Sequence, residues 1–165
     1  AYWTAKVGVD VLQLQYEHRE KIRARIGCHQ LLQQLKNRGY RCWLLTNADR
    51  AGLQLKLENI ELSPYFEVMV SSEELGHAKE QVAFWQKLQQ LHPFNPAQAV
   101  FVDDTVAVLE SAQDFGIAQL FSILQPSSAK PARAATELPY PALDHLTELV
   151  DYLDIKLQDT DAKTA

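Results

Sequence analysis

The sequence contains few of the residues that mark disulfide-rich, zinc-binding, membrane or nucleic-acid-binding proteins. Cys28 and Cys42 are its only cysteines, with no CxxC pair or histidine cluster beside them, so neither a disulfide framework nor a zinc site is expected. The five histidines show no metal-ligand spacing. No apolar run approaches the roughly 20 residues that span a bilayer, and a net charge of -5 argues against a broad basic surface. We therefore expect no nucleic-acid or membrane partner, and a cytoplasmic location.

The rest of the composition is that of an ordinary globular domain. Hydrophobic residues make up 47% of the chain and charged residues 22%, and 165 residues are enough to bury one substantial core. The chain starts at Ala1 without an initiator methionine and in the middle of a pattern. We therefore expect it to be a piece of a longer protein.

Apolar runs and helical stripes alternate along most of the chain. Short helices are expected before residue 26, and leucines at helical spacing followed by Gly39 predict a helix over 28–38. The next helix is expected to carry Leu53, Leu57 and Ile60 on one face. Further helices are predicted at 82–91, 106–115 and near 143–150, and strands at 42–45, 68–70, 99–103 and 118–124, with a proline-rich loop over 125–141. This succession predicts an α/β fold, a parallel sheet with helices on both faces.

The most informative stretch is the apolar run 99–102, which ends in Asp103 and Asp104. A buried strand that ends in two carboxylates places them at the carboxyl end of the sheet, where open α/β sheets bind ligands. Two adjacent carboxylates repel each other unless a cation or a shared proton compensates, and Mg²⁺ prefers such oxygen ligands. The plainer alternative is that Asp104 caps the following helix.

Two other strand ends or adjoining loops carry groups suited to phosphate. Thr46 ends the run 42–45 and offers a hydroxyl, and Lys79 follows the strand at 68–70 and offers an ammonium. Because parallel strands end at one edge of a sheet, we expect both side chains to converge with the two aspartates. Taken singly, Thr46 could merely end a strand and Lys79 could be a solvated loop lysine. Together the groups predict a site for a phosphoryl group and Mg²⁺.

The order of these motifs resembles that of the haloacid dehalogenase (HAD) superfamily. Its second, third and fourth motifs are similar to residues 44–47, to Lys79 after residues 76–78, and to residues 100–104 of this chain. Details such as residues 44–48, 56–58, 76–80 and 115–117 resemble the bacterial GMP/IMP nucleotidase branch of the superfamily. The resemblance implies a HAD-like Rossmannoid core.

The resemblance also implies an activity and a role for each residue. The family hydrolyses phosphomonoesters through an aspartyl-phosphate, which makes a nucleotide 5'-phosphatase acting on a small phosphorylated substrate such as GMP or IMP the expected function. Thr46 and Lys79 would be catalytic residues that hold the phosphoryl group, with Asn47 assisting at the phosphate loop. Asp103 and Asp104 would bind Mg²⁺ as the cofactor.

The resemblance further shows what the 165 residues do not contain. The family's first motif, Asp-x-Asp-x-Thr/Val at the end of the first strand, supplies the nucleophile and the general acid/base, and it does not occur here. The nearest stretch, residues 8–12, has Asp10 but neither the second acid nor the threonine. We therefore expect a truncated chain that is inactive alone, with residues 1–25 a remnant of the helical cap, 26–154 the core and 155–165 a flexible tail.

In the family the first strand lies at the centre of the sheet, between the strands that end here at Thr46 and Asp103. A chain without it leaves apolar strand edges unpaired, so strand-pairing self-association is expected. Two other functions stay open, a sugar-phosphate or phosphoglycolate-type phosphatase and a non-catalytic interaction protein. An upstream Asp-x-Asp-x-Thr/Val segment in the gene would favour an enzyme, and a natural start at Ala1 would favour an interaction protein.

Overall fold

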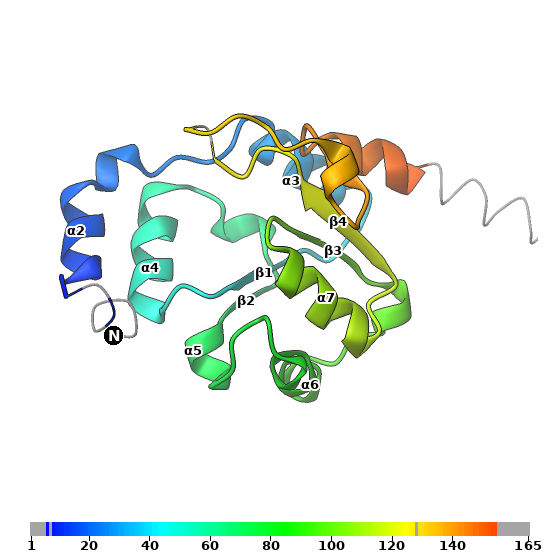
Figure 1. Cartoon of the computed structure of the whole chain (residues 1–165), viewed down its shortest axis with the longest axis horizontal. Coiled ribbons are helices and arrows are strands. Elements are labelled where there is room, and N and C mark those ends of the chain that lie inside the picture. The colour runs from blue at the N-terminus through cyan, green and yellow to red at the C-terminus, as the bar shows by residue number, and fades with distance from the viewer. Residues whose placement is uncertain (1–5, 7, 128, 155–165) are drawn as a thin grey trace, which may run out of the picture. The chain divides into compact units, whose positions relative to one another are not determined.

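The computed structural model of the chain describes residues 6, 8–127 and 129–154, and the chain divides into two compact units, residues 1–76 and 77–165 (Figure 1). Each unit contains its own parallel β-sheet. The predicted α/β class with parallel strands is therefore confirmed. Among the described residues, no helix is long and apolar enough to cross a membrane.

The sheet of the first unit consists of two parallel strands, β1 (Trp43–Thr46) and β2 (Val68–Ser71). Their register pairs Thr46 with Ser71, so both strands end at the same edge. The other elements of this unit are α2 (Val11–Glu17), η1 (Arg19–Lys21), α3 (Cys28–Asn37), α4 (Arg50–Asn59), η2 (Ser63–Tyr65) and α5 (Ser72–Leu75). Figure 1 shows α4 as the element that follows β1, as the parallel crossover to β2 requires.

The helices α3 and α4 follow from local sequence, but only α3 has the predicted buried face. Three leucines at helical spacing are buried in α3, and Gly39 takes a φ of +78° just after the helix, where a left-handed residue is needed. In α4 the residues buried are Gly52, Leu53 and Leu55, whereas Leu57 and Ile60 are only half-buried. The predicted face of α4 is therefore only partly buried, and α4 also contacts α2.

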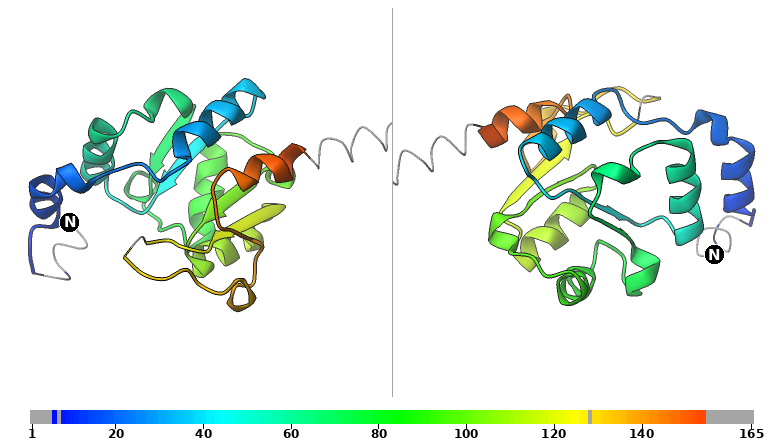
Figure 2. Two further views of the ribbon diagram at one scale, coloured as in Figure 1. Left: turned by 90° about the horizontal axis from the view of Figure 1, so that it is seen from above. Right: turned by 180° about the vertical axis from the view of Figure 1, so that it is seen from behind.

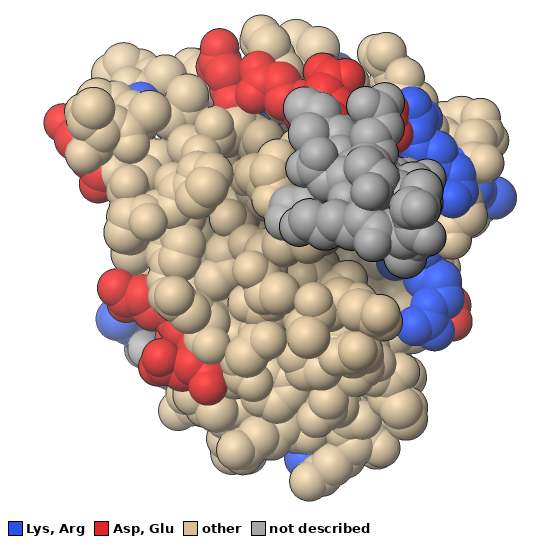
Figure 3. Space-filling model, turned by 90° about the vertical axis from the view of Figure 1, so that its right-hand side faces the viewer, with Lys and Arg blue, Asp and Glu red and all other residues tan. Residues whose placement is uncertain are grey.

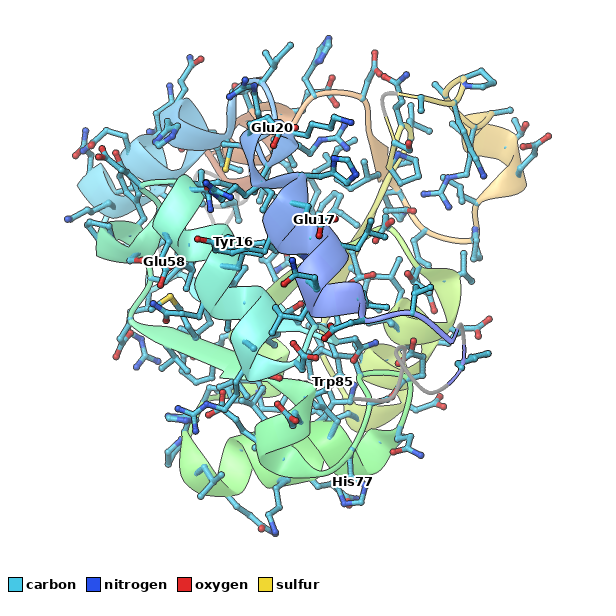
Figure 4. All side chains as sticks on the ribbon, turned by 90° about the vertical axis from the view of Figure 1, so that its left-hand side faces the viewer. Tyr16, Glu17, Glu20, Glu58, His77 and Trp85 are labelled. Atoms are coloured by element: carbon cyan, nitrogen blue, oxygen red, sulfur yellow. The ribbon has the colours of Figure 1, made fainter. Side chains whose placement is uncertain are left out.

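The helices α2 and α4 approach each other at a glycine. A Cβ at Gly52 would come within 3.3 Å of the Gln15 Oε1 atom of α2. None of the residues of α2 is buried, and Glu17 of α2 and Glu58 of α4 lie on the exposed surface seen in Figure 4. Asp10 is the N-cap of α2, since its carboxylate accepts a hydrogen bond from the Gln13 N–H at 3.0 Å. A helix cap is thus the role that Asp10 has in this structure.

The second unit contains a three-stranded parallel sheet in the order β3-β4-β5. Its strands are β3 (Val100–Asp103), β4 (Gln119–Ile123) and β5 (Ala142–Leu143), and its helices are α6 (Val82–Leu91), α7 (Val106–Phe115), η3 (Pro96–Gln98), η4 (Ala135–Glu137) and a helix over 148–154. The helix α7 packs on β3, β4 and α6. The long connection from β4 to β5 and the final helix can be followed in yellow and orange in Figure 2.

The core of the second unit is built around Trp85 of α6, which is fully buried. Its ring meets Phe84 and Phe101 edge-to-face, with centroids 5.2 and 4.9 Å apart, and stacks with Phe115 at 6.4 Å. Such offset and edge-to-face pairs add to the free energy gained by burying the rings. The packing joins α6, β3 and α7, and so fixes the strand end that carries the two aspartates.

Short elements were not predicted from the sequence, and Leu143, expected on the last helix, lies in β5, while that helix begins at residue 148. β5 has two residues, too few for a recognisable apolar pattern. α5 is a single turn that starts with a capping box, in which the Ser71 Oγ accepts from the main chain of the first turn and the Glu74 Oε1 accepts from the Ser71 N–H at 3.2 Å. The division into residues 1–25, 26–154 and 155–165 stays a prediction, and residues 155–165 lie outside the described part of the chain.

Candidate active site

Lys79 and Asp103 form a buried ion pair in the second unit. The Lys79 Nζ lies 2.5 Å from the Asp103 Oδ2, and the two side chains are only 10% and 8% exposed. Lys79 belongs to the segment between α5 and α6, and Asp103 is the last residue of β3. The alternative of a solvated loop lysine is therefore wrong. A buried pair of opposite charges needs close geometry to offset the cost of desolvation, and this pair has it.

The turn after β3 gives the two aspartates different surroundings. The Asp103 Oδ1 accepts a hydrogen bond from the Thr105 N–H at 2.9 Å, so both oxygens of this carboxylate have a partner. Thr105 is the N-cap of α7 without a side-chain bond, so the alternative that Asp104 caps this helix is wrong. The Asp104 side chain is exposed, and no hydrogen bond or ion pair joins it to the described residues.

The carboxylate oxygens at this turn fit part of a Mg²⁺ site. Mg²⁺ takes six oxygen ligands in octahedral geometry, usually one or two carboxylates with waters and substrate oxygens. Asp104 offers a carboxylate that is open to solvent, and Asp103 is adjacent to it and already charge-balanced by Lys79. Within the described residues no group of three His, Cys, Asp or Glu side chains could hold a metal. The aspartates would therefore supply two ligands, and others would have to come from elsewhere.

Trp85 holds the main chain of Lys79 and was not identified from the sequence. Its Nε1–H is shared between the Lys79 carbonyl oxygen at 3.0 Å and the Ser111 Oγ at 3.1 Å. A buried indole N–H needs an acceptor, and here the acceptor belongs to a site residue. The available signal was a tryptophan on the apolar stripe of α6, which indicates a partner but does not identify it.

The loop after β1 in the first unit is ordered by its own side chains. The Thr46 Oγ1 accepts a hydrogen bond from the Ala48 N–H at 3.0 Å, and Asp49 caps α4 by accepting from the Gly52 N–H at 2.7 Å. Because Thr46 uses an oxygen lone pair for the Ala48 bond, its hydroxyl hydrogen can be donated elsewhere. Asn47 lies between them and is exposed.

Ser71 fastens this loop to the end of β2 and was also missed. Its Oγ donates to the Ala48 carbonyl oxygen at 2.6 Å and accepts from the Glu73 N–H at 3.2 Å, and the residue is fully buried. Glu73 in turn accepts a hydrogen bond from the Arg50 N–H at 3.0 Å. The Ser-x-x-Glu pattern of residues 71–74 could have revealed the cap, but not the bond to Ala48.

The predicted site residues thus lie in both units. Lys79, Asp103 and Asp104 are together in the second unit, and Thr46 and Asn47 are on the β1 loop of the first. Their convergence on one point stays a prediction.

Comparison with known protein families shows to which family this chain belongs. The sequence pattern of the haloacid dehalogenase-like hydrolases matches residues 9–121, more than half of the chain. The chain belongs to this family. The match to this HAD family covers β1, β2 and β3, and therefore the strand ends that carry Thr46, Asp103 and the loop before Lys79. The resemblance inferred from the motifs is confirmed.

Known HAD relatives are similar but distant. The GMP/IMP nucleotidase YrfG of Escherichia coli is 28% identical over 127 residues, which cover 77% of this chain and 57% of YrfG. A HAD phosphatase structure from Thermococcus onnurineus matches with a TM-score of 0.74 at 19% identity, covering 92% of this chain and 69% of that one. The HAD-hydrolase YfnB from Bacillus subtilis, solved bound to magnesium, matches with a TM-score of 0.68 at 18% identity, covering 82% and 57%. The two structures show a shared fold, and the chain spans little more than half the length of YrfG.

Proposed function

We propose that this chain carries the phosphate-binding and metal-binding part of a Mg²⁺-dependent HAD phosphomonoester hydrolase. The observation that supports this most is the buried Lys79–Asp103 pair beside the exposed Asp104 carboxylate at the end of β3. An ammonium fixed next to a carboxylate pair is suited to a ligand that brings both negative charge and a bridging cation. The fold and the family are those in which this chemistry occurs.

In the proposed mechanism each residue binds or orients. Lys79, held in place by Asp103 and through its carbonyl by Trp85, would bind a phosphoryl oxygen. Thr46 would donate its hydroxyl hydrogen to a second phosphoryl oxygen, with its orientation set by the Ala48 N–H. Asn47 would contribute at the same loop. Asp103 and Asp104 would hold Mg²⁺, which when bound neutralises charge on the phosphoryl group.

The proposed substrate is a purine nucleoside monophosphate, and the support for it is the similarity to the nucleotidase YrfG. A sugar phosphate or phosphoglycolate is the alternative, because 28% identity over part of YrfG leaves substrate selection open. The net charge of -5 argues against a nucleic acid as substrate, and on the face shown in Figure 3 lysine and arginine form only small groups among acidic and uncharged residues. The cytoplasmic location stays a prediction.

The experiment is a phosphatase assay with GMP, a sugar phosphate and an aryl phosphate in Mg²⁺. Because the 165 residues contain no Asp-x-Asp-x-Thr/Val motif and Asp10 is a helix cap, we expect no turnover by this chain alone. If the gene encodes that motif upstream of Ala1, the extended protein should hydrolyse at least one substrate, and EDTA should abolish the activity. Turnover by the 165-residue chain that survives Asp10→Asn would contradict the proposed mechanism.

A second candidate function, an interaction protein that pairs strands, is favoured by a specific feature of the sheets. Among the described residues, β1 is bonded to β2 alone and β3 to β4 alone, and every residue of β1 and β3 is only half-buried. Apolar strands with one open edge are templates for pairing with another chain. This edge could be filled by a second copy.

We therefore expect the purified chain to self-associate as its concentration rises, since pairing would satisfy main-chain groups of β1 or β3. Sedimentation velocity over a hundredfold range of concentration, about micromolar upward, measures this at the affinities typical of weak interfaces. Adding a segment that carries the first motif should reduce the association by occupying the edge. A monomer at every concentration would rule out the strand-pairing function.

A further inference from the structure

Arg133 joins the aspartate turn to the end of the neighbouring strand. It lies in the connection between β4 and β5, where its main-chain N–H donates to the Leu124 carbonyl oxygen at 2.9 Å. Its Nη1 donates to the Asp104 carbonyl oxygen at 3.0 Å. Its Nη2 donates to the Ile123 carbonyl oxygen and, at 3.5 Å, reaches the Ser122 Oγ.

The contacts of this side chain indicate a role in position and not in charge pairing. All of its acceptors are neutral oxygens, and its Nε is buried without an acceptor among the described residues. A guanidinium holds its N–H donors in a rigid plane. Its two terminal nitrogens, Nη1 and Nη2, therefore hold the two main-chain segments that they bond at a fixed separation. Here the segments are the residue after β3 and the end of β4, where Asp103 pairs with Ser122 in the register.

We propose that Arg133 is a positioning residue for the metal site. By holding the Asp104 carbonyl against the end of β4, it fixes the main chain of residues 103–105, and with it the directions of both aspartate side chains. The inference rests on the proposed function for its metal, but the geometry that it describes exists without metal. Arg133 touches neither carboxylate, so it acts through the turn.

A purely electrostatic role predicts the opposite effect on metal binding. A guanidinium near two carboxylates repels Mg²⁺, so removing its charge alone should strengthen Mg²⁺ binding. Loss of a positioning contact should instead weaken Mg²⁺ binding, because Mg²⁺ demands near-ideal geometry. The sign of the change therefore separates the two roles.

The test compares Arg133→Met, Arg133→Lys and a matched control, Lys130→Met, which removes a positive charge from an exposed residue of the same connection. Two quantities are measured by NMR on the 165-residue chain. The first is the hydrogen-exchange rate of the Thr105 amide without metal, since this N–H bonds to Asp103. The second is the Mg²⁺ affinity from the shifts of the same amide, which in the unmodified chain should be weaker than micromolar.

We expect Arg133→Met to speed exchange at Thr105 and weaken Mg²⁺ binding, each by about tenfold or more, the value of one hydrogen bond of a charged donor. Arg133→Lys should change the exchange rate and the Mg²⁺ affinity in the same directions, because it keeps the positive charge but loses the paired donors of the guanidinium. Lys130→Met should change neither quantity. Stronger Mg²⁺ binding or unchanged exchange in Arg133→Met would overturn the proposal, and if this variant does not fold, Arg133→Lys decides by the same criteria. No Mg²⁺ response in the unmodified chain would count against the proposed function, and the exchange rates would still test Arg133.

Discussion

Replacing Lys79 with methionine is expected to lower the free energy of unfolding by about 3–5 kcal/mol, the cost of breaking a buried ion pair by removing one partner. The substitution leaves the Asp103 carboxylate, only 8% exposed, without its cation and with a hydrogen bond from the Thr105 N–H. The methionine fills most of the volume of the lysine stem, so the loss reports the charge. Urea unfolding followed by circular dichroism measures it.

A matched control is available in the same unit. Lys87 of α6 is exposed, and Lys87→Met should change the free energy of unfolding by no more than about 0.5 kcal/mol. The double variant Lys79→Met with Asp103→Asn should lose less than the sum of the two single losses, because the second change removes the unpaired charge. Equal losses in Lys79→Met and Lys87→Met would show that the pair does not stabilise the fold.

Truncation of Trp85 is also expected to lower the free energy of unfolding strongly. Trp85→Ala should cost about 3–5 kcal/mol, since it removes a fully buried ring that contacts Phe84, Phe101 and Phe115 and leaves a cavity. It also removes the donor shared by the Lys79 carbonyl and Ser111. Equilibrium unfolding in urea measures the loss, and a decrease below about 1 kcal/mol would show that the site collapses around the smaller side chain.

The variant Trp85→Phe distinguishes the contribution of the indole N–H to stability from that of the buried aromatic ring. It keeps an aromatic ring in the core but removes both hydrogen bonds and one of the two fused rings, so we expect a loss of about 1–3 kcal/mol, smaller than that of Trp85→Ala. If Trp85 also orders Lys79, combining Trp85→Phe with Lys79→Met should give less than the sum of the single losses. Strict additivity would mean that the indole stabilises the core without ordering Lys79.

Much of this protein follows from local sequence patterns. The four longer strands and the helices between them, the helix over 28–38 with Gly39 after it, and the placement of Thr46 and Asp103 at strand ends were all predicted correctly. These features depend on neighbours a few residues apart, on helical spacing, on apolar runs and on the left-handed φ that glycine tolerates. The family membership followed from the order of short motifs, for the same reason.

The sequence could not separate Asp103 from Asp104, two identical and adjacent side chains. The structure gives one a buried lysine and leaves the other exposed, because the pleat of β3 directs Asp103 inward and the strand ends before Asp104. Likewise, α4 buries Gly52 and Leu55, which lie outside its predicted face. Burial of this kind is a property of what packs on a residue, and periodicity alone does not contain it.

What the sequence by itself determined is therefore the class of fold, the family and the candidate phosphate and metal residues. What only the tertiary structure decided is which side chains hold those residues in place: Lys79 on Asp103, Trp85 on the Lys79 carbonyl and Arg133 on the Asp104 carbonyl. The partners in the first and last of these contacts are 24 and 29 residues apart, and Trp85 is fixed in turn by Ser111, 26 residues away. Contacts at such separations are created by the packing of whole strands and helices, so no local pattern of residues encodes them.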